Sequence, residues 1–316
     1  MHVRFPSSLR LSFFLLLGLP FFFLGGPSYH SSRSFAHLWN LGHILYFALV
    51  TRWLHLALVK RLGTGTPARK VLILLLVIPF LIGLALEISQ FFVTGRNPDI
   101  FDLLRNELGV ALALAFAQQP LGLFLSKNWR RTIQGTAFLV LLATASPLVF
   151  ALVDESLAVE KFPILSDFES SLELSRWMNP AQLQEETKIV RHGTQAARVQ
   201  LSTNKYSGVS LFHFPGDWRG FSMLHFSVYN PLAFPLALNC RIHDTKHKLH
   251  GSLYHDRFNT IFELTPGWND LAVSLKEVED APKERKMDMR HIEGFGLFVV
   301  QQKEPLSIVL DYVYLR

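Results

Sequence analysis

The stretch EISQFFVTGRNPDIFDLLRNELGVALAL, residues 87–114, contains two apolar segments separated by a short polar turn. If both segments are helices, polar side chains recur on one face of each, because residues three or four apart share a helix face. These residues are Glu87, Gln90, Asp99, Asp102 and Asn106. Ionisable groups within apolar helices usually face the interior of a bundle, where they pair or mark a functional site. The stretch therefore predicts two helices of a membrane bundle with a polar cluster where they meet.

Five apolar segments lie before residue 154, and a membrane crossing needs roughly 20 mostly apolar residues. They are Leu11–Gly25, Leu41–Val59, Val71–Phe92, Leu103–Gln118 and Ile133–Val153. The first follows Arg4 and Arg10 as a signal peptide would, but the GGPSYHSS after it lacks a small-x-small cleavage site. We therefore expect an all-α membrane bundle of about five transmembrane helices, with an uncleaved first helix.

Lysine and arginine are concentrated in alternate loops between these segments, and short loops of this kind stay on the cytoplasmic side. The residues are Arg4, Arg10, Lys60, Arg61, Arg69, Lys70, Lys127, Arg130 and Arg131. The pattern predicts a multi-pass protein of a bacterial cytoplasmic membrane, in contact with membrane lipid. Its N-terminus is cytoplasmic, and everything after Val153 is periplasmic or extracellular. The formal charge of +6 lies in short clusters rather than in one stripe, so we expect no nucleic-acid partner.

The same topology brings two further residues to the level of the polar cluster. His43 lies in the second segment at a matching depth, and Arg96 lies in the turn after the third segment. An unpaired Glu87 carboxylate would be strongly disfavoured in hydrocarbon, and Arg96 is the nearest fixed cation along the chain. We expect these two side chains to pair. The cluster is then either a structural clasp between helices or a site for a ligand or for catalysis.

A family resemblance rests on these residues. The run of residues 87–114, preceded by LGHILYFAL at residues 41–49, resembles the VanZ-like membrane family over approximately residues 10–120. That family combines a histidine on its second helix with an E-x-x-Q, an arginine, a D-x-x-D/N-x-x-x-N turn and a glycine that opens the next helix. The matching residues are His43, Glu87, Gln90, Arg96, Asp99, Asp102, Asn106 and Gly109.

The chain departs from the family pattern just before the histidine. Trp39 and Asn40 stand where the family has an Asp-Lys pair, so a role tied to that pair does not carry over. The family is named for a member linked to low-level resistance to the glycopeptide teicoplanin. The resemblance therefore implies a role in the cell envelope and supplies a location and a motif rather than a reaction.

From Phe162 onward the pattern changes to short alternating segments separated by Gly, Pro, Asn and Asp. They are ARVQLS, GVSLFH, MLHFSVYN, LALNCRI, NTIFEL, NDLAVSL, GFGLFVV and LSIVLDYVYL. Such strands with turn signals between them predict an all-β sandwich or jelly roll. The single cysteine, Cys240, cannot form an internal disulfide, so the core alone must hold this domain. The expected division is a transmembrane bundle at 1–125, a fifth helix and linker at 126–160, and an extracytoplasmic sandwich at 161–316.

The all-β part resembles the galactose-binding-like jelly rolls of carbohydrate-binding modules over roughly residues 164–316. The runs ILSDFES, GTQAARVQL, YSGVSLFHFPGDWRGFSMLHFSVYNP, GWNDLAVSL and LDYVYL carry the resemblance in this order. Sugar recognition combines aromatic faces with groups that hydrogen-bond paired hydroxyls. The candidates of these kinds are Asp217, Trp218, Arg219, Tyr254, Asp256, Arg257, Asn259 and Trp268. Both tryptophans could instead pack at the rim of the domain.

A structural calcium site is also predicted. Asp167 and Glu169 near the start of the sandwich and Asp311 near its end would meet where the termini of a jelly roll pair. Calcium prefers such oxygen ligands, and solvated surface carboxylates are the alternative.

The motifs favour a non-catalytic role. The sequence contains no G-x-S-x-G, P-loop, G-x-G-x-x-G or H-E-x-x-H. We therefore expect an envelope protein whose sandwich binds a polysaccharide, another glycan or a protein. The alternative is a membrane enzyme or transporter that acts on a lipid-linked envelope precursor through Glu87, Arg96, Asp99 and Asp102.

Overall fold

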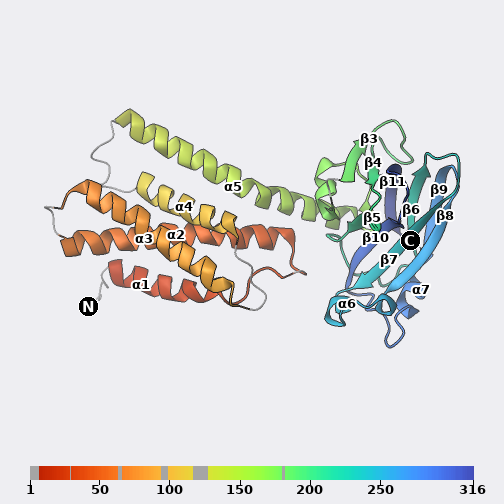
Figure 1. Cartoon of the computed structure of the whole chain (residues 1–316), viewed down its shortest axis with the longest axis horizontal. Coiled ribbons are helices and arrows are strands. Elements are labelled where there is room, and N and C mark those ends of the chain that lie inside the picture. Colours follow the sequence, from red (N-terminus) through yellow and green to blue (C-terminus); the bar gives the residue numbers. More distant parts are fainter. Residues whose placement is uncertain (1–6, 29, 63–65, 94–98, 117–126, 180–181) are drawn as a thin grey trace. The chain divides into compact units, whose positions relative to one another are not determined.

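The computed structural model describes residues 7–28, 30–62, 66–93, 99–116, 127–179 and 182–316. The chain consists of two compact units, Met1–Val149 and Phe150–Arg316. The first unit is helical, and the second is built around two β-sheets (Figure 1). Helix α5 (Lys127–Lys161) contributes residues to both.

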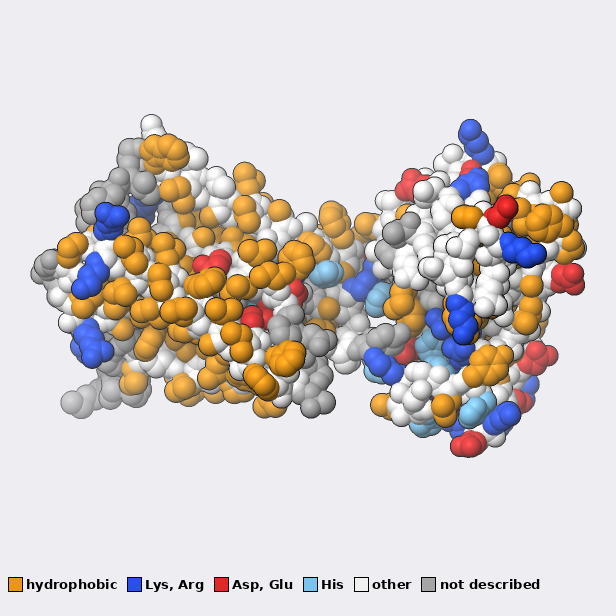
Figure 2. Space-filling view, viewed as in Figure 1, with side chains coloured by type: hydrophobic (Ala, Val, Ile, Leu, Met, Phe, Trp, Pro, Cys, Tyr) orange, Lys and Arg blue, Asp and Glu red, His pale blue; other side chains and the backbone are white. Residues whose placement is uncertain are grey.

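The helical unit carries much of its apolar surface on the outside. Its elements before α5 are α1 (Ser7–Gly18), η1 (Leu19–Phe22), α2 (Arg33–Leu62), α3 (Ala68–Gln90) and α4 (Ile100–Ala115). Large apolar side chains such as Phe14, Leu81 and Leu139 are more than half exposed. Figure 2 shows hydrophobic side chains over most of the visible face of this unit. A continuous apolar surface of this extent is stable against lipid rather than against water.

Among the described residues, three helices are long and apolar enough to cross a membrane, namely α2, α3 and the Asn128–Lys161 part of α5. The first predicted segment forms a shorter apolar helix, Leu9–Phe22, and the fourth corresponds to α4, which has 16 residues. The helical bundle is confirmed, and five is an approximate number of crossings. In Figure 1 the C-terminal end of α2 and the N-terminal ends of α3 and α5 lie at one end of this unit. Seven of the predicted cytoplasmic residues belong to these ends, namely Lys60, Arg61, Arg69, Lys70, Lys127, Arg130 and Arg131. Arg10 lies in α1, and Arg4 lies outside the described residues.

Helices α2 and α4 pack closely because residue 109 has no side chain. A β-carbon at Gly109 would collide with the backbone carbonyl oxygen of Ile44 and would lie 3.0 Å from the amide nitrogen of Ala48. Small residues allow helix backbones to approach in this way in membrane bundles. Phe47 and Val110 are completely buried in the same region. The approach places the first turns of α4 against the part of α2 that carries His43.

The second unit is an antiparallel β-sandwich. One sheet has the order β3-β4-β11-β6-β9, with β1 paired to β11, and the other has the order β2-β5-β10-β7-β8. The first sheet contains β1 (Ile164–Ser166), β3 (Leu183–Glu186), β4 (Ala196–Leu201), β6 (Met223–Asn230), β9 (Gly267–Ser274) and β11 (Leu306–Leu315). The second contains β2 (Trp177–Met178), β5 (Tyr206–Leu211), β7 (Leu236–Asp244), β8 (Phe258–Leu264) and β10 (Ile292–Val300). The predicted sandwich is confirmed, and each of the eight predicted runs falls on a strand.

The last turns of α5 belong to the sandwich unit. Asp154 and Arg176 form a pair in which both side chains are 1% exposed, with Arg176 Nη2 donating to Asp154 Oδ1 at 2.8 Å. Arg176 Nη1 also donates to the carbonyl oxygen of Leu165 at 3.1 Å. A buried guanidinium needs this number of acceptors to offset its lost hydration. The helix therefore ends as a fixed part of the sandwich at Lys161.

Candidate functional site

The polar cluster of the helical unit is built around His43 of α2. Its Nδ1 lies 3.0 Å from Asn106 Oδ1, and its Nε2 lies 3.5 Å from Asp102 Oδ2. The edge of its ring packs against Phe22, with the ring centroids 4.9 Å apart. His43 is 6% exposed and Asn106 is completely buried. Both nitrogens of the imidazole therefore face oxygen atoms of α4 side chains, and its ring packs against Phe22.

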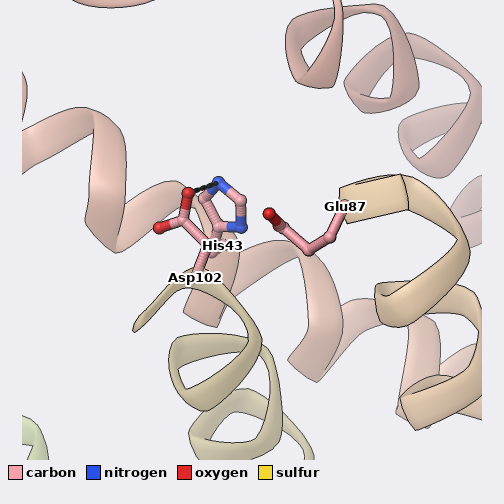
Figure 3. Close-up of side chains that lie close together, drawn as sticks. All are labelled: His43, Glu87 and Asp102. Atoms are coloured by element: carbon pink, nitrogen blue, oxygen red, sulfur yellow. Dashed lines mark ion pairs between the residues drawn. The ribbon is translucent and has the colours of Figure 1, made fainter. Parts of the chain in front are cut away.

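Glu87, in the last turn of α3, points toward this histidine (Figure 3). Its Oε2 accepts a hydrogen bond from the backbone N–H of Asp99 at 3.0 Å. The second oxygen, Oε1, is buried and has no hydrogen-bond partner among the described residues. One ligand atom each from His43, Glu87 and Asp102 lies within 4.8 Å of the others. Three acceptor-bearing side chains from three helices thus converge inside the unit.

Arg105 supplies the cation of this cluster. Its Nη1 donates to Asp102 Oδ1 and lies 3.5 Å from Asp99 Oδ2. Asp99 is also the N-cap of α4, because its Oδ1 accepts from the N–H of Phe101 at 2.9 Å. Sequence reasoning missed Arg105, although its i, i+3 spacing from Asp102 was a usable signal.

Two further residues, Gln90 and Arg96, were predicted to belong to the cluster. Gln90 lies apart from the carboxylates, because its Nε2 donates to the carbonyl oxygen of Phe22 at 3.0 Å and ties α3 to η1. Arg96 lies outside the described residues, so the predicted Glu87–Arg96 pair stays a prediction.

An apolar groove of about 420 Å³ runs past the cluster. Most of its lining is leucine, isoleucine and phenylalanine, including Phe91 and Phe92, which are 71% and 80% exposed. Glu87 and Asp99 are its charged lining residues. A hydrocarbon chain in this groove would have its polar end beside these two carboxylates.

The five-stranded sheet of the sandwich has a second candidate site, a groove of about 640 Å³ on its outer face. Two rows of cross-strand neighbours lie at this place in the sheet, one of Ser210, Gly296, Arg241 and Asn259, the other of Gly208, Phe298 and Asn239. All of them except Gly296 and Asn259 line the groove. A β-carbon at Gly296 would lie 2.8 Å from both Arg241 Nε and Ser210 Oγ. The glycine therefore leaves room for the Arg241 side chain to cross the floor, where its Nη2 donates to Ser210 Oγ at 3.1 Å.

Two exposed tyrosines stand in this groove, with Tyr206 62% and Tyr254 70% exposed. Arg257 lies over the ring of Tyr254, with its guanidinium carbon 5.6 Å from the ring centroid. Asn259 holds this pair, accepting from Arg257 Nε at 2.9 Å and donating to the carbonyl oxygen of Tyr254 at 2.9 Å. Burial and the nearby charge of Arg241 lower the pKa of Arg257. The described lining residues include no aspartate or glutamate.

Three of the eight predicted sugar-contacting residues thus belong to or support the groove, and five do not. Trp218 is completely buried in the sandwich core, so neither face of its ring can stack on a sugar. Asp256 is 8% exposed and binds Arg285, which lowers the pKa of Asp256 to about 2.

The other three candidates lie elsewhere on the surface. Trp268 and Tyr229 lie on neighbouring strands of the other sheet, away from the groove. They pack against each other, with ring centroids 5.4 Å apart. Asp217 and Arg219 form an exposed ion pair at 2.7 Å. Sequence reasoning missed four lining residues, Tyr206, Asn239, Arg241 and Phe298. Side chains alternate between the two faces along a strand, and these four occupy outward positions, so the alternation could have identified them.

The residues predicted to hold calcium have separate partners. Asp167 accepts from Lys161 Nζ at 2.8 Å, and Glu169 Oε1 accepts from the backbone N–H groups of Thr194 and Gln195. Asp311 Oδ2 accepts from two other backbone N–H groups. The described residues contain one group of three convergent ligand side chains, and it is the one in the helices. The three carboxylates of the sandwich do not form such a group, and the calcium site stays a prediction.

The comparisons with known proteins bear on the two units separately. A family model described as VanZ/LLP1 matches residues 7–119, a span that contains α1 to α4 and the whole polar cluster. Residues 7–119 form a VanZ-like domain. Helix α5 and the sandwich lie outside the match, which covers less than half of the chain. No curated protein matches the chain.

Solved structures that resemble part of the chain include carbohydrate-binding modules and agarases. A family 11 carbohydrate-binding module from Clostridium thermocellum, in complex with a β-1,3-1,4-mixed-linked tetrasaccharide, has 15% identity and a TM-score of 0.35. That match covers 48% of this chain and 93% of the module. An exo-β-agarase has 13% identity and a TM-score of 0.39, over 48% of this chain and 24% of the agarase.

Proposed function

We propose that this chain is an integral membrane protein of the cell envelope whose sandwich binds an acidic glycan in the groove of its five-stranded sheet. One observation carries the proposal. The groove combines two exposed tyrosine rings with Arg241 and Arg257, and its described lining contains no carboxylate.

Each part of the groove suits a charged sugar chain. Flat aromatic rings pack against the apolar faces of sugar rings, and amide and hydroxyl groups such as those of Asn239 and Ser210 bind their hydroxyls. The planar guanidinium binds carboxylate and sulfate groups through two parallel hydrogen bonds. A lining without carboxylates does not repel an anion. A uronic-acid or sulfated polysaccharide therefore fits better than a neutral one.

Binding to a matched pair of polysaccharides tests this proposal. We expect full-length protein in detergent to bind polygalacturonate at least tenfold more tightly than its carboxyl-reduced form, a difference of about 1.4 kcal/mol. Arg257→Gln should remove most of that preference. Arg219→Gln is the matched control, because it also removes one positive charge but lies in an exposed ion pair away from the groove. Equal binding of both polysaccharides by the wild type would reject an acidic ligand.

The proposed location of the groove is outside the cytoplasm. The support is the gathering of Lys60, Arg61, Arg69 and Lys70 at the α2–α3 connection, at the opposite end of the helices from the polar cluster. Alkaline phosphatase fused after Val153 should be active, and a cytoplasmic reporter at the same position inactive. The reverse pattern would place the groove inside the cell.

A second candidate function is supported by the apolar groove beside Glu87 and Asp99. In this alternative the VanZ-like domain acts on a lipid-linked envelope precursor, with its lipid in the groove and its head group at the cluster. Glu87→Gln and Asp102→Asn should then abolish the cellular phenotype at normal protein abundance, while Arg257→Gln leaves it intact. The opposite result supports the glycan groove as the functional site.

A further inference from the structure

We propose that His43, Glu87 and Asp102 bind a divalent transition-metal ion within the VanZ-like domain. Zinc is the ion that this ligand set matches best, since zinc accepts imidazole nitrogen together with carboxylate oxygen. The proposal does not depend on what the sandwich binds.

The first argument comes from the protonation of His43. An amide oxygen only accepts hydrogen bonds, so the contact between His43 Nδ1 and Asn106 Oδ1 at 3.0 Å requires a proton on Nδ1. In the neutral imidazole, Nε2 then carries a lone pair. That lone pair faces Asp102 Oδ2, which is 3.5 Å away and is also an acceptor. A metal ion held by Nε2 and Oδ2 would satisfy both of these acceptors.

The second argument comes from Glu87. Its side chain is 6% exposed, and its Oε1 has no hydrogen-bond partner among the described residues. Figure 3 shows the carboxylate directed at the imidazole. A buried carboxylate oxygen without a partner is destabilising, because nothing replaces the hydrogen bonds that it makes with water in the unfolded chain. A cation at the convergence point of the three side chains would remove this cost.

A proton and a metal ion satisfy the cluster to different extents. A second proton on His43 would create an ion pair with Asp102, but it would leave Glu87 Oε1 unsatisfied. A divalent ion meets all three acceptors together. Zinc holds such ligands at about 2.0–2.2 Å. The ligand atoms lie within 4.8 Å of one another, so the side chains would move closer together to hold an ion at these distances.

Neighbouring groups orient the three proposed ligand side chains through hydrogen bonds, as the groups around metal ligands do in other proteins. Asn106 acts as a positioning residue, because its bond to Nδ1 fixes both the tautomer and the plane of the imidazole. Arg105 holds the other oxygen of Asp102, and the backbone N–H of Asp99 holds the other oxygen of Glu87. Each carboxylate thus has one oxygen fixed and one directed inward.

Zinc titration of the full-length protein tests the proposal. The protein is purified in detergent without a polyhistidine tag, stripped with chelator and titrated with ZnCl₂ by calorimetry, with melting temperature measured in parallel. We expect one tight site per chain and a rise in the melting temperature of the helices, because binding to the native state stabilises it. Glu87→Gln and His43→Gln should weaken binding at least 100-fold. Glu107→Gln, which removes a carboxylate of α4 outside the cluster, should bind like the wild type.

A spectroscopic measurement keeps the test decisive if a variant does not fold. X-ray absorption on wild-type protein loaded with one zinc should show nitrogen and oxygen ligands, including imidazole. Stoichiometric binding that survives Glu87→Gln and is lost in His247→Gln would assign the metal to the sandwich and overturn the proposal. Absence of saturable zinc binding by the folded wild type would overturn it as well.

Discussion

Two buried polar networks, one in each unit, contain carboxylates and histidines but differ in how the carboxylates are satisfied. In the sandwich, Arg285 binds Asp244 through Nη2 at 2.8 Å and Asp256 through Nε at 2.6 Å. Both Asp244 oxygens also accept backbone N–H groups. In the helices, Glu87 retains a buried oxygen without a described partner. A network whose acceptors are all satisfied stabilises a fold, whereas a buried acceptor that keeps an unsatisfied oxygen can receive a ligand.

The largest expected effect comes from removing the centre of the saturated network. Arg285→Met leaves Asp244 and Asp256 buried without their cation, and breaking a buried pair in this way costs about 3–5 kcal/mol. Hydrogen-exchange protection of β10 in the full-length protein measures the loss. Arg219→Met, which breaks an exposed pair, should cost under about 1 kcal/mol. Equal losses of stability in both variants would mean that the buried pairs of Arg285 contribute no more to stability than an exposed ion pair.

The histidine beside this network predicts a loss of sandwich stability in acid. Burial, with smaller effects of the His247 and Arg241 charges, lowers the pKa of His243 to about 3. The unfolded chain binds this proton near pH 6.5, and the folded sandwich does not. Stability should therefore fall as the pH drops below 6.5, by about 2–3 kcal/mol at pH 4.5.

His243→Gln should reduce this pH dependence, since one titrating group is gone. Burial also lowers the pKa of His247, so His247 should retain part of the dependence. His291→Gln is the control, because His291 is largely exposed at 54% of its side chain. Asp256, with a pKa of about 2, titrates below this window and contributes little between pH 6.5 and 4.5. An unchanged slope in His243→Gln would assign the acid sensitivity to other groups.

The unsaturated network depends on how closely α2 and α4 approach. Gly109→Ala places a methyl group against the Ile44 carbonyl oxygen, and overpacking of this kind costs about 1–3 kcal/mol. The variant should lower the melting temperature of the helices and weaken zinc binding together. Gly135→Ala is the matched control, since a β-carbon there meets nothing within 4 Å and alanine favours the helix. Loss of stability without any loss of zinc affinity would separate the helix contact from the metal site.

The smallest expected effect concerns calcium. Lys161 Nζ lies 2.8 Å from Asp167 and 3.1 Å from Glu173, so an ammonium group already provides the positive charge that the sequence had led us to expect from calcium. Calcium and chelator should therefore change the melting temperature of the wild-type sandwich by less than about 1 °C. Lys161→Gln should lower it by a few degrees, in line with about 1 kcal/mol. A clear rise with calcium in the wild type would restore the predicted metal site.

Sequence reasoning succeeded where a pattern repeats along the chain. Helical spacing predicted that Asp102 and Asn106 share a face, and depth in the apolar segments predicted that His43 and Glu87 would meet them. Alternation predicted the strands of both sheets. The contact partners of individual side chains were harder to predict, because they depend on how helices and strands pack against one another. In the run GDWRG, Trp218 was a reasonable candidate for stacking on a sugar, yet it packs into the core. Arg241 was predicted only as part of a strand, yet it lines the groove.

The order of residues alone was therefore enough to predict a membrane bundle with a polar cluster, a sandwich after it, and a VanZ-like motif. Hydropathy and periodicity are local properties, and they are visible without coordinates. The convergence of His43, Glu87 and Asp102, the crossing of Arg241 over Gly296, and the contact of Lys161 with Asp167 became visible only in three dimensions. Each of these depends on distances between side chains from separate helices or strands, and sequence spacing does not determine such distances.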